Sequence, residues 1–292
     1  MTTTTQLPRR KERLAPYTTF GIGGSAEWFF EPRNLGELSY AYRTAHQESQ
    51  DVRVLGGGSN LLIADGEINA AIISMRRFEP RLIEHADGSS IVRASAGVRL
   101  SRLVNRCAHW GLSGLECMTG IPGTVGGAIC MNAGGASGAI GNRIAAIEVM
   151  DKDGSVRRIR ARDLKWAYRH SNLRKSLVVY AELELVRKTA DDVRMGITEL
   201  LRKKSATQPL RAHSAGCFFC NPDGDSAGRL VDSAGLKGFR VGGAEVSMKH
   251  ANFMINRGGA TARDVVELVR QVREAVLQRF HVELQNEVHY WS

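Results

Sequence analysis

The chain has 292 residues, of which 43% are hydrophobic and 24% are charged, and its 40 Lys and Arg against 30 Asp and Glu give a formal net charge of +10. This composition excludes a disordered chain and a disulfide-stapled miniprotein, and the length predicts about two domains. The basic N-terminus has no apolar signal-peptide core, and no stretch approaches the roughly 18 apolar residues of a membrane span. We therefore expect a cytoplasmic protein without a membrane span.

The net charge indicates which classes of ligand the protein could bind, and the cysteines indicate the redox state of its compartment. A net charge of +10 favours an anionic partner, which leaves nucleic acid, a membrane surface and small phosphorylated ligands open, besides an ordinary basic surface. The cysteines are odd in number and irregularly spaced, which favours a reducing compartment over secretion. They are Cys107, Cys117, Cys130, Cys217 and Cys220.

The first half of the chain predicts a mixture of strands and helices. Residues 1–14 are expected to form a flexible arm. A helix over 98–110 is predicted to end at Gly111. Asn34 is a suitable N-cap for an earlier helix, whose apolar face would be formed by Leu35, Leu38, Tyr42 and Ala45. Strands are predicted over four short apolar runs, at 52–55, 61–64, 70–74 and 90–96.

The middle of the chain continues this mixed pattern. Residues 145–151 and 155–160 predict a hairpin around Asp153 and Gly154. Another strand is predicted over 177–187. The polar, helix-prone stretch at 188–205 is expected to contain a domain boundary.

The last 90 or so residues contain the clearest helix signal in the sequence. Thr261 and Asp264 form a capping-box pattern at its start. The chain then closes with a strand-like run at 282–291. The apolar stripe of the helix consists of Val265, Leu268, Val269, Val272, Val276 and Phe280.

Glycine is unusually frequent, at 31 of 292 residues against a usual share of about 7%. Many glycines fall in two loops, GGGSN at 56–60 and GIPGTVGGA at 120–128. Glycine lets a backbone approach a ligand closely, and successive N–H groups in such loops can bind an anion. Two such loops suggest a ligand that carries a diphosphate, whereas the simpler alternative is tight turns between strands. A Rossmann fingerprint is not matched, because Leu61 stands at the third glycine position, and neither loop contains the Lys of a P-loop.

Several long motifs in the same order resemble one enzyme family. The runs VLGGGSNLL at 54–62 and GIPGTVGGA at 120–128, followed by MNAG at 131–134, resemble the FAD-binding segments of the UDP-N-acetylenolpyruvoylglucosamine reductase family. The run TTFGIGG at 18–24 is similar to the family's N-terminal motif, so that the resemblance covers about residues 16–291. It implies an α+β fold with a two-lobed FAD-binding domain of the vanillyl-alcohol-oxidase (PCMH) type and a C-terminal α+β substrate domain. The implied parts are a flexible arm at 1–15, FAD-binding lobes at 16–75 and 76–190, and a substrate-binding domain at 191–292.

The resemblance also implies a reaction and its ligands. Members of the family are NADPH-dependent UDP-N-acetylmuramate dehydrogenases, which reduce UDP-N-acetylglucosamine enolpyruvate to UDP-N-acetylmuramate in bacterial peptidoglycan-precursor synthesis. Reduced FAD passes a hydride to C3 of the enolpyruvyl ether, and a protein acid protonates C2. The residues expected to contact FAD are Gly56, Gly57, Gly58, Ser59, Asn60, Leu61, Ile121, Pro122, Gly123, Thr124, Gly126, Gly127 and Ala128.

Three positions would carry the chemistry that the resemblance implies. Arg169 lies in the family's Tyr-Arg-x-Ser motif, after the substrate contact Tyr168, and would neutralise the substrate carboxylate as charge builds at C2. Glu287 matches an acidic residue that could stay protonated beside that carboxylate and donate a hydrogen bond. Cys217 stands where the family has its proton-donating Ser. A thiol is a stronger acid than an alcohol, yet it is mostly protonated at pH 7, so a donor is retained.

Cys220 is a second departure from the family pattern, which commonly has Lys or another polar residue there. With Cys217 it forms a C-x-x-C motif, which taken alone predicts either a redox dithiol or half of a zinc site. No second Cys or His pair is evident, and we expect no metal. Weaker candidates for contacts to the UDP-sugar are Asn221, Lys249 and Asn252.

Two alternatives to the reductase remain open. The changes at Cys217 and Cys220 allow a non-catalytic protein that binds flavin or a UDP-sugar. The FAD fold also allows a carbohydrate oxidase, although no motif for covalent flavin attachment is matched. Nucleic-acid binding has only the net charge behind it. We therefore expect a monomer that binds FAD, NADPH and a UDP-sugar, and no nucleic acid.

Overall fold

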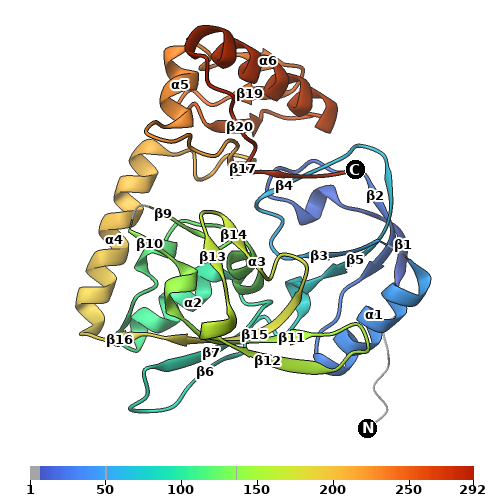
Figure 1. Cartoon of the computed structure of the whole chain (residues 1–292), viewed down its shortest axis with the longest axis vertical. Helices are drawn as coiled ribbons and strands as arrows, with labels where there is room; N and C mark the ends of the chain where they lie inside the picture. The colour runs from blue at the N-terminus through green and yellow to red at the C-terminus, as the bar shows by residue number, and fades with distance from the viewer. Residues whose placement is uncertain (1–6, 50, 136) are drawn as a thin grey trace. The chain divides into compact units, whose positions relative to one another are not determined.

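The computed structural model describes residues 7–49, 51–135 and 137–292, which form mixed α and β structure (Figure 1). Its α-helices are α1 (Leu35–Glu48), α2 (Leu100–His109), α3 (Val125–Cys130), α4 (Ala190–Thr207), α5 (Ala227–Ser233) and α6 (Ala262–Phe280). Short 3-10 helices lie at Ala15–Tyr17, Met75–Arg77, Glu116–Met118, Ile140–Arg143 and Ala161–Asp163. Among the described residues, no helix is both long enough and apolar enough to cross a bilayer.

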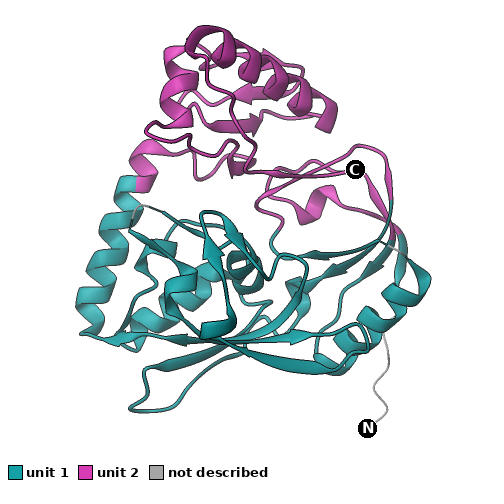
Figure 2. Ribbon diagram, viewed as in Figure 1, with its two compact units in different colours: residues 1–10, 28–57, 69–203 teal, residues 11–27, 58–68, 204–292 magenta. Residues whose placement is uncertain are grey.

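The chain divides into two compact units whose segments alternate along the sequence (Figure 2). Unit 1 contains the described residues up to Arg10, Trp28–Gly57 and Asn69–Lys203. Unit 2 contains Lys11–Glu27, Gly58–Ile68 and Lys204–Ser292. Each unit therefore collects segments from distant parts of the chain. The domain boundaries that the family resemblance implies, at residues 15, 75 and 190, instead divide the chain into consecutive segments. They stay a prediction.

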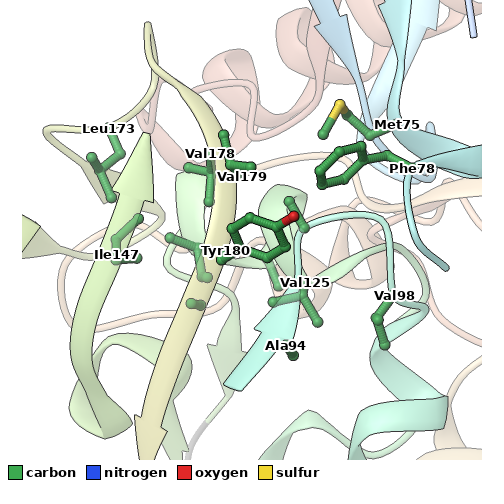
Figure 3. Close-up of a cluster of buried hydrophobic side chains, with 14 of the residues drawn as sticks. Met75, Phe78, Ala94, Val98, Val125, Ile147, Leu173, Val178, Val179 and Tyr180 are labelled. Carbon is green, nitrogen blue, oxygen red and sulfur yellow. The ribbon is translucent and has the colours of Figure 1, made fainter. Parts of the chain in front are cut away.

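The main sheet of unit 1 is antiparallel, with its strands in the order β12-β11-β15-β7-β6. α3 packs against β15 and β7, and α2 contacts α3. Val125, the first residue of α3, lies in the buried cluster that also contains Val98 and Val179 (Figure 3). The core thus fixes the helix that follows the second glycine loop. The strands are β12 (Val156–Arg160), β11 (Ile144–Met150), β15 (Leu177–Glu184), β7 (Ile91–Ser95) and β6 (Ile83–His85).

A second sheet has the order β1-β2-β5-β3, in which β3 and β5 are parallel. The buried face of α1 belongs to the same core as Ile73 of β5. The strands of this sheet are β1 (Arg9–Arg13), β2 (Ser25–Phe30), β5 (Glu67–Ser74) and β3 (Val52–Leu55). Two-stranded pairs join β9 (Gly134–Gly135) to β10 (Gly138–Ala139), β13 (Trp166–Ala167) to β14 (His170–Ser171), and β8 (Leu112–Ser113) to β16 (Val186–Arg187).

Unit 2 is built around an antiparallel sheet in the order β17-β20-β19-β18. α6 packs against β18 and β19, and it also contacts α5. A separate parallel pair joins β4 (Leu61–Ile63) to β21 (His289–Trp291), which is far from it in sequence. The strands of the sheet are β17 (Ser214–Cys217), β20 (Phe253–Asn256), β19 (Ala244–Val246) and β18 (Arg240–Val241).

Local sequence signals predicted α1, α2, α4 and α6, whereas the short helices α3 and α5 were not expected. The Asn34 side chain accepts a hydrogen bond from the Glu37 amide at 2.9 Å, which begins α1 as expected. Thr261 and Asp264 form the predicted capping box of α6. The predicted stripe of α6 is buried at Val265, Leu268, Val269, Val272 and Val276.

Three expectations are wrong in detail. Arg9–Arg13, expected within a flexible arm, form β1, because they find a partner strand that local sequence does not reveal; residues 1–6 of that arm lie outside the described residues. Leu35 is 38% exposed, since a side chain in the first turn of a helix points back past its N-terminus. The run 282–291 forms only β21 and an isolated bridge at Asn286, because its earlier part pairs irregularly with residues 218–220.

Gly24 offers a test of the packing in unit 2. A Cβ at Gly24 would overlap the carbonyl oxygen of Gly66, whereas a Cβ at Gly66 would meet nothing within 4 Å. We expect Gly24→Ala to lower the free energy of unfolding by about 3 kcal/mol, since backbone must move. Gly66→Ala should change it by less than about 1 kcal/mol. Denaturant unfolding checks this, and equal stabilities of the two variants would contradict the close approach.

Candidate functional site

The two glycine loops meet backbone to backbone. A Cβ at Gly57 would lie 2.5 Å from the Cα of Gly123, and a Cβ at Gly56 would lie 2.7 Å from Oγ1 of Thr124. Both distances are shorter than real Cβ contacts, so these positions exclude any side chain. The loops that the sequence separates by about 65 residues therefore form one surface.

This surface offers backbone N–H groups from both loops. Among the described residues, the amides of Gly57, Gly123 and Thr124 donate to no protein acceptor. By contrast, the amides of Val125 and Gly126 donate to the carbonyls at positions 98 and 96, at 2.9 and 3.0 Å. Backbone amides that have no protein acceptor, two of them on glycines, suit an anionic diphosphate, so the residues present fit the predicted cofactor.

Tyr168 and Arg169 form the two-residue tip of the β13–β14 hairpin. The backbone of Arg169 has φ 52°, a left-handed conformation, and its guanidinium lies 4.8 Å from the centre of the Tyr168 ring. Asn132 donates from Nδ2 to the Ala167 carbonyl at 2.9 Å, and Ser171 donates to the Cys130 carbonyl at 2.8 Å. The hairpin is thus tied at both sides to the end of α3, the helix that the second glycine loop begins.

In unit 2, backbone hydrogen bonds place Cys217 and Glu287 on adjacent segments. The amide of Glu287 donates to the Phe218 carbonyl at 2.8 Å, and the amide of Cys220 donates to the Gln285 carbonyl at 2.8 Å. The segment carrying Cys217 therefore runs beside the segment carrying Glu287. Sequence positions 70 residues apart are brought together in this way.

A cavity of about 470 Å³ lies beside α6 in the same unit. It is lined by Leu62, Phe218 and Val288 among others, and its lining does not include Cys217 or Glu287.

Comparison with known proteins decides the family. A model described as an FAD binding domain matches residues 26–160, and one described as the C-terminal domain of UDP-N-acetylenolpyruvoylglucosamine reductase matches residues 208–291. The UDP-N-acetylenolpyruvoylglucosamine reductase of Moorella thermoacetica is 42% identical over 282 residues, which cover 96% of this chain and 92% of that protein. The chain belongs to the UDP-N-acetylenolpyruvoylglucosamine reductase family.

Further members of the reductase family agree. The reductase of Prochlorococcus marinus is 39% identical over 277 residues, which cover 94% of each protein. The crystal structure of the reductase from Thermus caldophilus has a TM-score of 0.83 at 39% identity and covers 98% of this chain and 100% of that one. The predicted α+β fold class, with its FAD-binding domain and C-terminal domain, is confirmed, and FAD is the cofactor of this reductase.

The three weaker candidates for substrate contacts all have partners inside the protein. Asn252 is only 2% exposed, accepts from the Phe219 amide at 2.9 Å and donates to the Phe219 carbonyl at 2.8 Å. The side chain of Asn221 accepts from the Ala227 amide at the start of α5, and Lys249 donates to the carbonyl of Ser205. Asn252 therefore holds the segment that follows Cys217, and its contact with the UDP-sugar stays a prediction.

Neither Cys217 nor Cys220 forms a disulfide in the described residues, so the redox role of the C-x-x-C motif stays a prediction. Burial raises the pKa of Cys107 and of Cys130 to about 12, as expected for unreactive thiols. No group of His, Cys, Asp and Glu in the described residues is arranged to hold a metal.

Two residues with clear positions near the site were absent from the sequence-based candidates. Asn132 lies in the MNAG motif, and besides Ala167 it binds the Gly141 amide through Oδ1 at 3.1 Å. Thr19 lies in the TTFGIGG motif, and its Oγ1 donates to the Ser214 carbonyl at 2.7 Å. Their motifs were recognised, but a motif does not reveal a partner 195 positions away.

The contact between the loops predicts the effect of Gly57→Ala on cofactor binding. The added methyl group must push the backbone of Gly123 away, which would separate the amides that both loops present. We expect the purified variant to retain less than about a tenth of the wild-type FAD, since each lost charge-assisted hydrogen bond costs about 1.5 kcal/mol or more.

The matched control is Gly196→Ala in α4, where a Cβ would lie an ordinary 3.7 Å from the Glu116 side chain. Flavin absorbance per mole of protein is the measurement. Full flavin content in Gly57→Ala would show that the loop contact does not shape the cofactor site.

Proposed function

We propose that this reductase converts UDP-N-acetylglucosamine enolpyruvate to UDP-N-acetylmuramate with NADPH, and that Cys217 is its proton donor. The observation that carries the proposal is the hydrogen bond from the Glu287 amide to the Phe218 carbonyl, at 2.8 Å. It sets two acidic side chains on neighbouring segments of a chain that belongs to the reductase family. Such a pair can donate a proton to a ligand from one side chain and a hydrogen bond to the ligand's carboxylate from the other.

The role of Cys217 follows from the chemistry of the reaction. FAD, when bound, supplies the hydride that it has received from NADPH to C3 of the enolpyruvyl ether. The electron pair of the double bond then moves toward C2 and the carboxylate. The Sγ–H of Cys217 donates its proton to C2, and the thiolate that remains is a stable anion because the reference pKa of a thiol is about 8.5.

Glu287 and Arg169 would act on the substrate carboxylate. A protonated Glu287 donates a hydrogen bond from its carboxyl group to the oxygen on which charge develops. Arg169 supplies a permanent positive charge from a hairpin that Asn132 and Ser171 tie to the end of α3. Tyr168, beside it at the tip, is proposed to contact the substrate.

The partners and the compartment follow the same proposal. The ligands are FAD, NADPH and a UDP-sugar, all anionic, which accounts for the net charge of +10 without nucleic acid. We propose that the protein acts as a monomer in the bacterial cytoplasm.

One assay separates the proposal from its alternatives. Anaerobic NADPH oxidation by the purified flavoprotein is followed with and without UDP-N-acetylglucosamine enolpyruvate. Oxidation that depends on this substrate supports the reductase. Oxygen uptake with a sugar would indicate a carbohydrate oxidase, and bound flavin without turnover would indicate a non-catalytic protein.

Cys217 is tested by the pair Cys217→Ala and Cys217→Ser. We expect Cys217→Ala to slow reoxidation of the reduced flavin by substrate by about 100-fold or more, since a general acid contributes about that factor. Cys217→Ser restores the hydroxyl donor of the family and should keep most of the rate. Reduction of the flavin by NADPH, followed by stopped-flow absorbance, should be unchanged in both. A wild-type reoxidation rate in Cys217→Ala would rule out the assignment.

Glu287 is tested against Glu283, which lies on the same run and pairs on the surface with Arg273 at 3.1 Å. We expect Glu287→Ala to lower kcat by about 100-fold, the usual effect of losing one donor to a developing oxyanion. Glu287→Gln keeps an N–H donor and should recover part of the rate. Glu283→Ala should leave kcat unchanged because an exposed ion pair contributes little. Equal kcat values for Glu287→Ala and Glu283→Ala would contradict the role.

A further inference from the structure

Thr19 connects the first glycine loop to the strand that carries Cys217. Its amide donates to the carbonyl of Gly58 at 3.0 Å, and its Oγ1 donates to the carbonyl of Ser214 at 2.7 Å. Ser214 is the first residue of β17, and Cys217 is the last. Oγ1 also lies 3.4 Å from the Gly58 carbonyl, so its shorter bond, to Ser214, is the one that joins the loop to the strand.

The position of Thr19 is fixed by the shape of Gly58. Gly58 has φ +64°, and a Cβ there would overlap the carbonyl oxygen of Tyr17. The chain at 17–19 therefore packs directly on the backbone of Gly58, where no side chain fits. This close contact places the hydroxyl of Thr19 between Gly58 and β17.

Asn60 makes the corresponding connection to Glu287. Its Nδ2 donates to the carbonyl of Glu287 at 3.1 Å, and its own carbonyl accepts from the His289 amide at 3.0 Å. The parallel pairing of β4 with β21 begins at the next residue, Leu61 with His289. The acid is therefore held at the end of a ladder that starts on the glycine loop.

We propose that Thr19 and Asn60 are positioning residues, which set Cys217 and Glu287 relative to the glycine loop at 56–60. The inference rests on the proposed function, because it requires Cys217 and Glu287 to act on the substrate. A proton donor must lie within hydrogen-bond reach of C2 while the hydride arrives from the cofactor held by the loop. A misplacement of about 1 Å costs on the order of 100-fold in rate, so these two bridges matter for catalysis without touching the substrate.

The first test compares Thr19→Val with Thr19→Ser. Valine keeps the shape of threonine and removes the hydroxyl, whereas serine keeps the hydroxyl. We expect Thr19→Val to slow reoxidation of reduced flavin by UDP-N-acetylglucosamine enolpyruvate about 10-fold or more, while Thr19→Ser stays close to wild type. Flavin content and the rate of flavin reduction by NADPH should remain within about 2-fold of wild type, because neither uses the Cys217 proton.

The second test asks whether each residue acts through its proposed partner. If Thr19 positions Cys217, Thr19→Val should have almost no further effect in a Cys217→Ala background, since residues that act as a unit are not additive. Asn60→Ala should likewise slow reoxidation in the wild type and have little further effect in a Glu287→Ala background. If one of the single variants folds poorly, the other double-mutant cycle still tests the inference.

The outcomes separate the inference from the proposed function. A slow Cys217→Ala enzyme together with a wild-type rate in Thr19→Val overturns the inference alone. Fully additive effects, or equal losses in both half-reactions and in flavin content, also overturn it, because they indicate a merely structural role. A wild-type rate in Cys217→Ala overturns the proton-donor assignment, and the inference falls with it.

Discussion

The contact between Gly57 and Gly123 is the constraint on which the candidate site depends. Because Gly57 leaves no room for a side chain against the backbone of Gly123, the two loops present their amides on one surface. Each loop is also connected to segments that carry proposed catalytic residues. The second loop begins α3, whose far end holds the hairpin of Arg169 through Asn132. The first loop continues through Gly58 to the bridges made by Thr19 and Asn60.

Backbone hydrogen bonds join the segments that carry Cys217 and Glu287, and the Asn252 side chain adds two further bonds at Phe219. The buried side-chain amide of Asn252 bonds to both the N–H and the C=O of Phe219, as a neighbouring strand would do in a sheet. Side chains that project from such a framework can change without moving it. Under the proposed function, such a framework would accept cysteines where the family resemblance places a serine and commonly a lysine.

The sequence predicted what depends on neighbours in the chain and missed what depends on distant partners. Caps at Asn34 and Thr261 and the stripe of α6 follow from local geometry, and the structure has them. The glycine loops were recognised from composition and motif, but their mutual contact was not. The strand at Arg9–Arg13 and the buried role of Asn252 need partners that no local pattern encodes. The assigned chemical roles came from family resemblance, since one surface arginine or glutamate looks like another in a sequence.

The bridge from Asn60 to Glu287 joins residues 227 positions apart, and this separation has a consequence for how the chain folds. Closing so long a loop costs entropy before any contact repays it, so such pairings form late and slowly. During synthesis, β4 emerges early and has no partner strand until residues 289–291 have been made. An unpaired strand edge is open to association with other chains in that interval. The connection that orders the site is therefore also the step at which an incomplete chain is most exposed to misassembly.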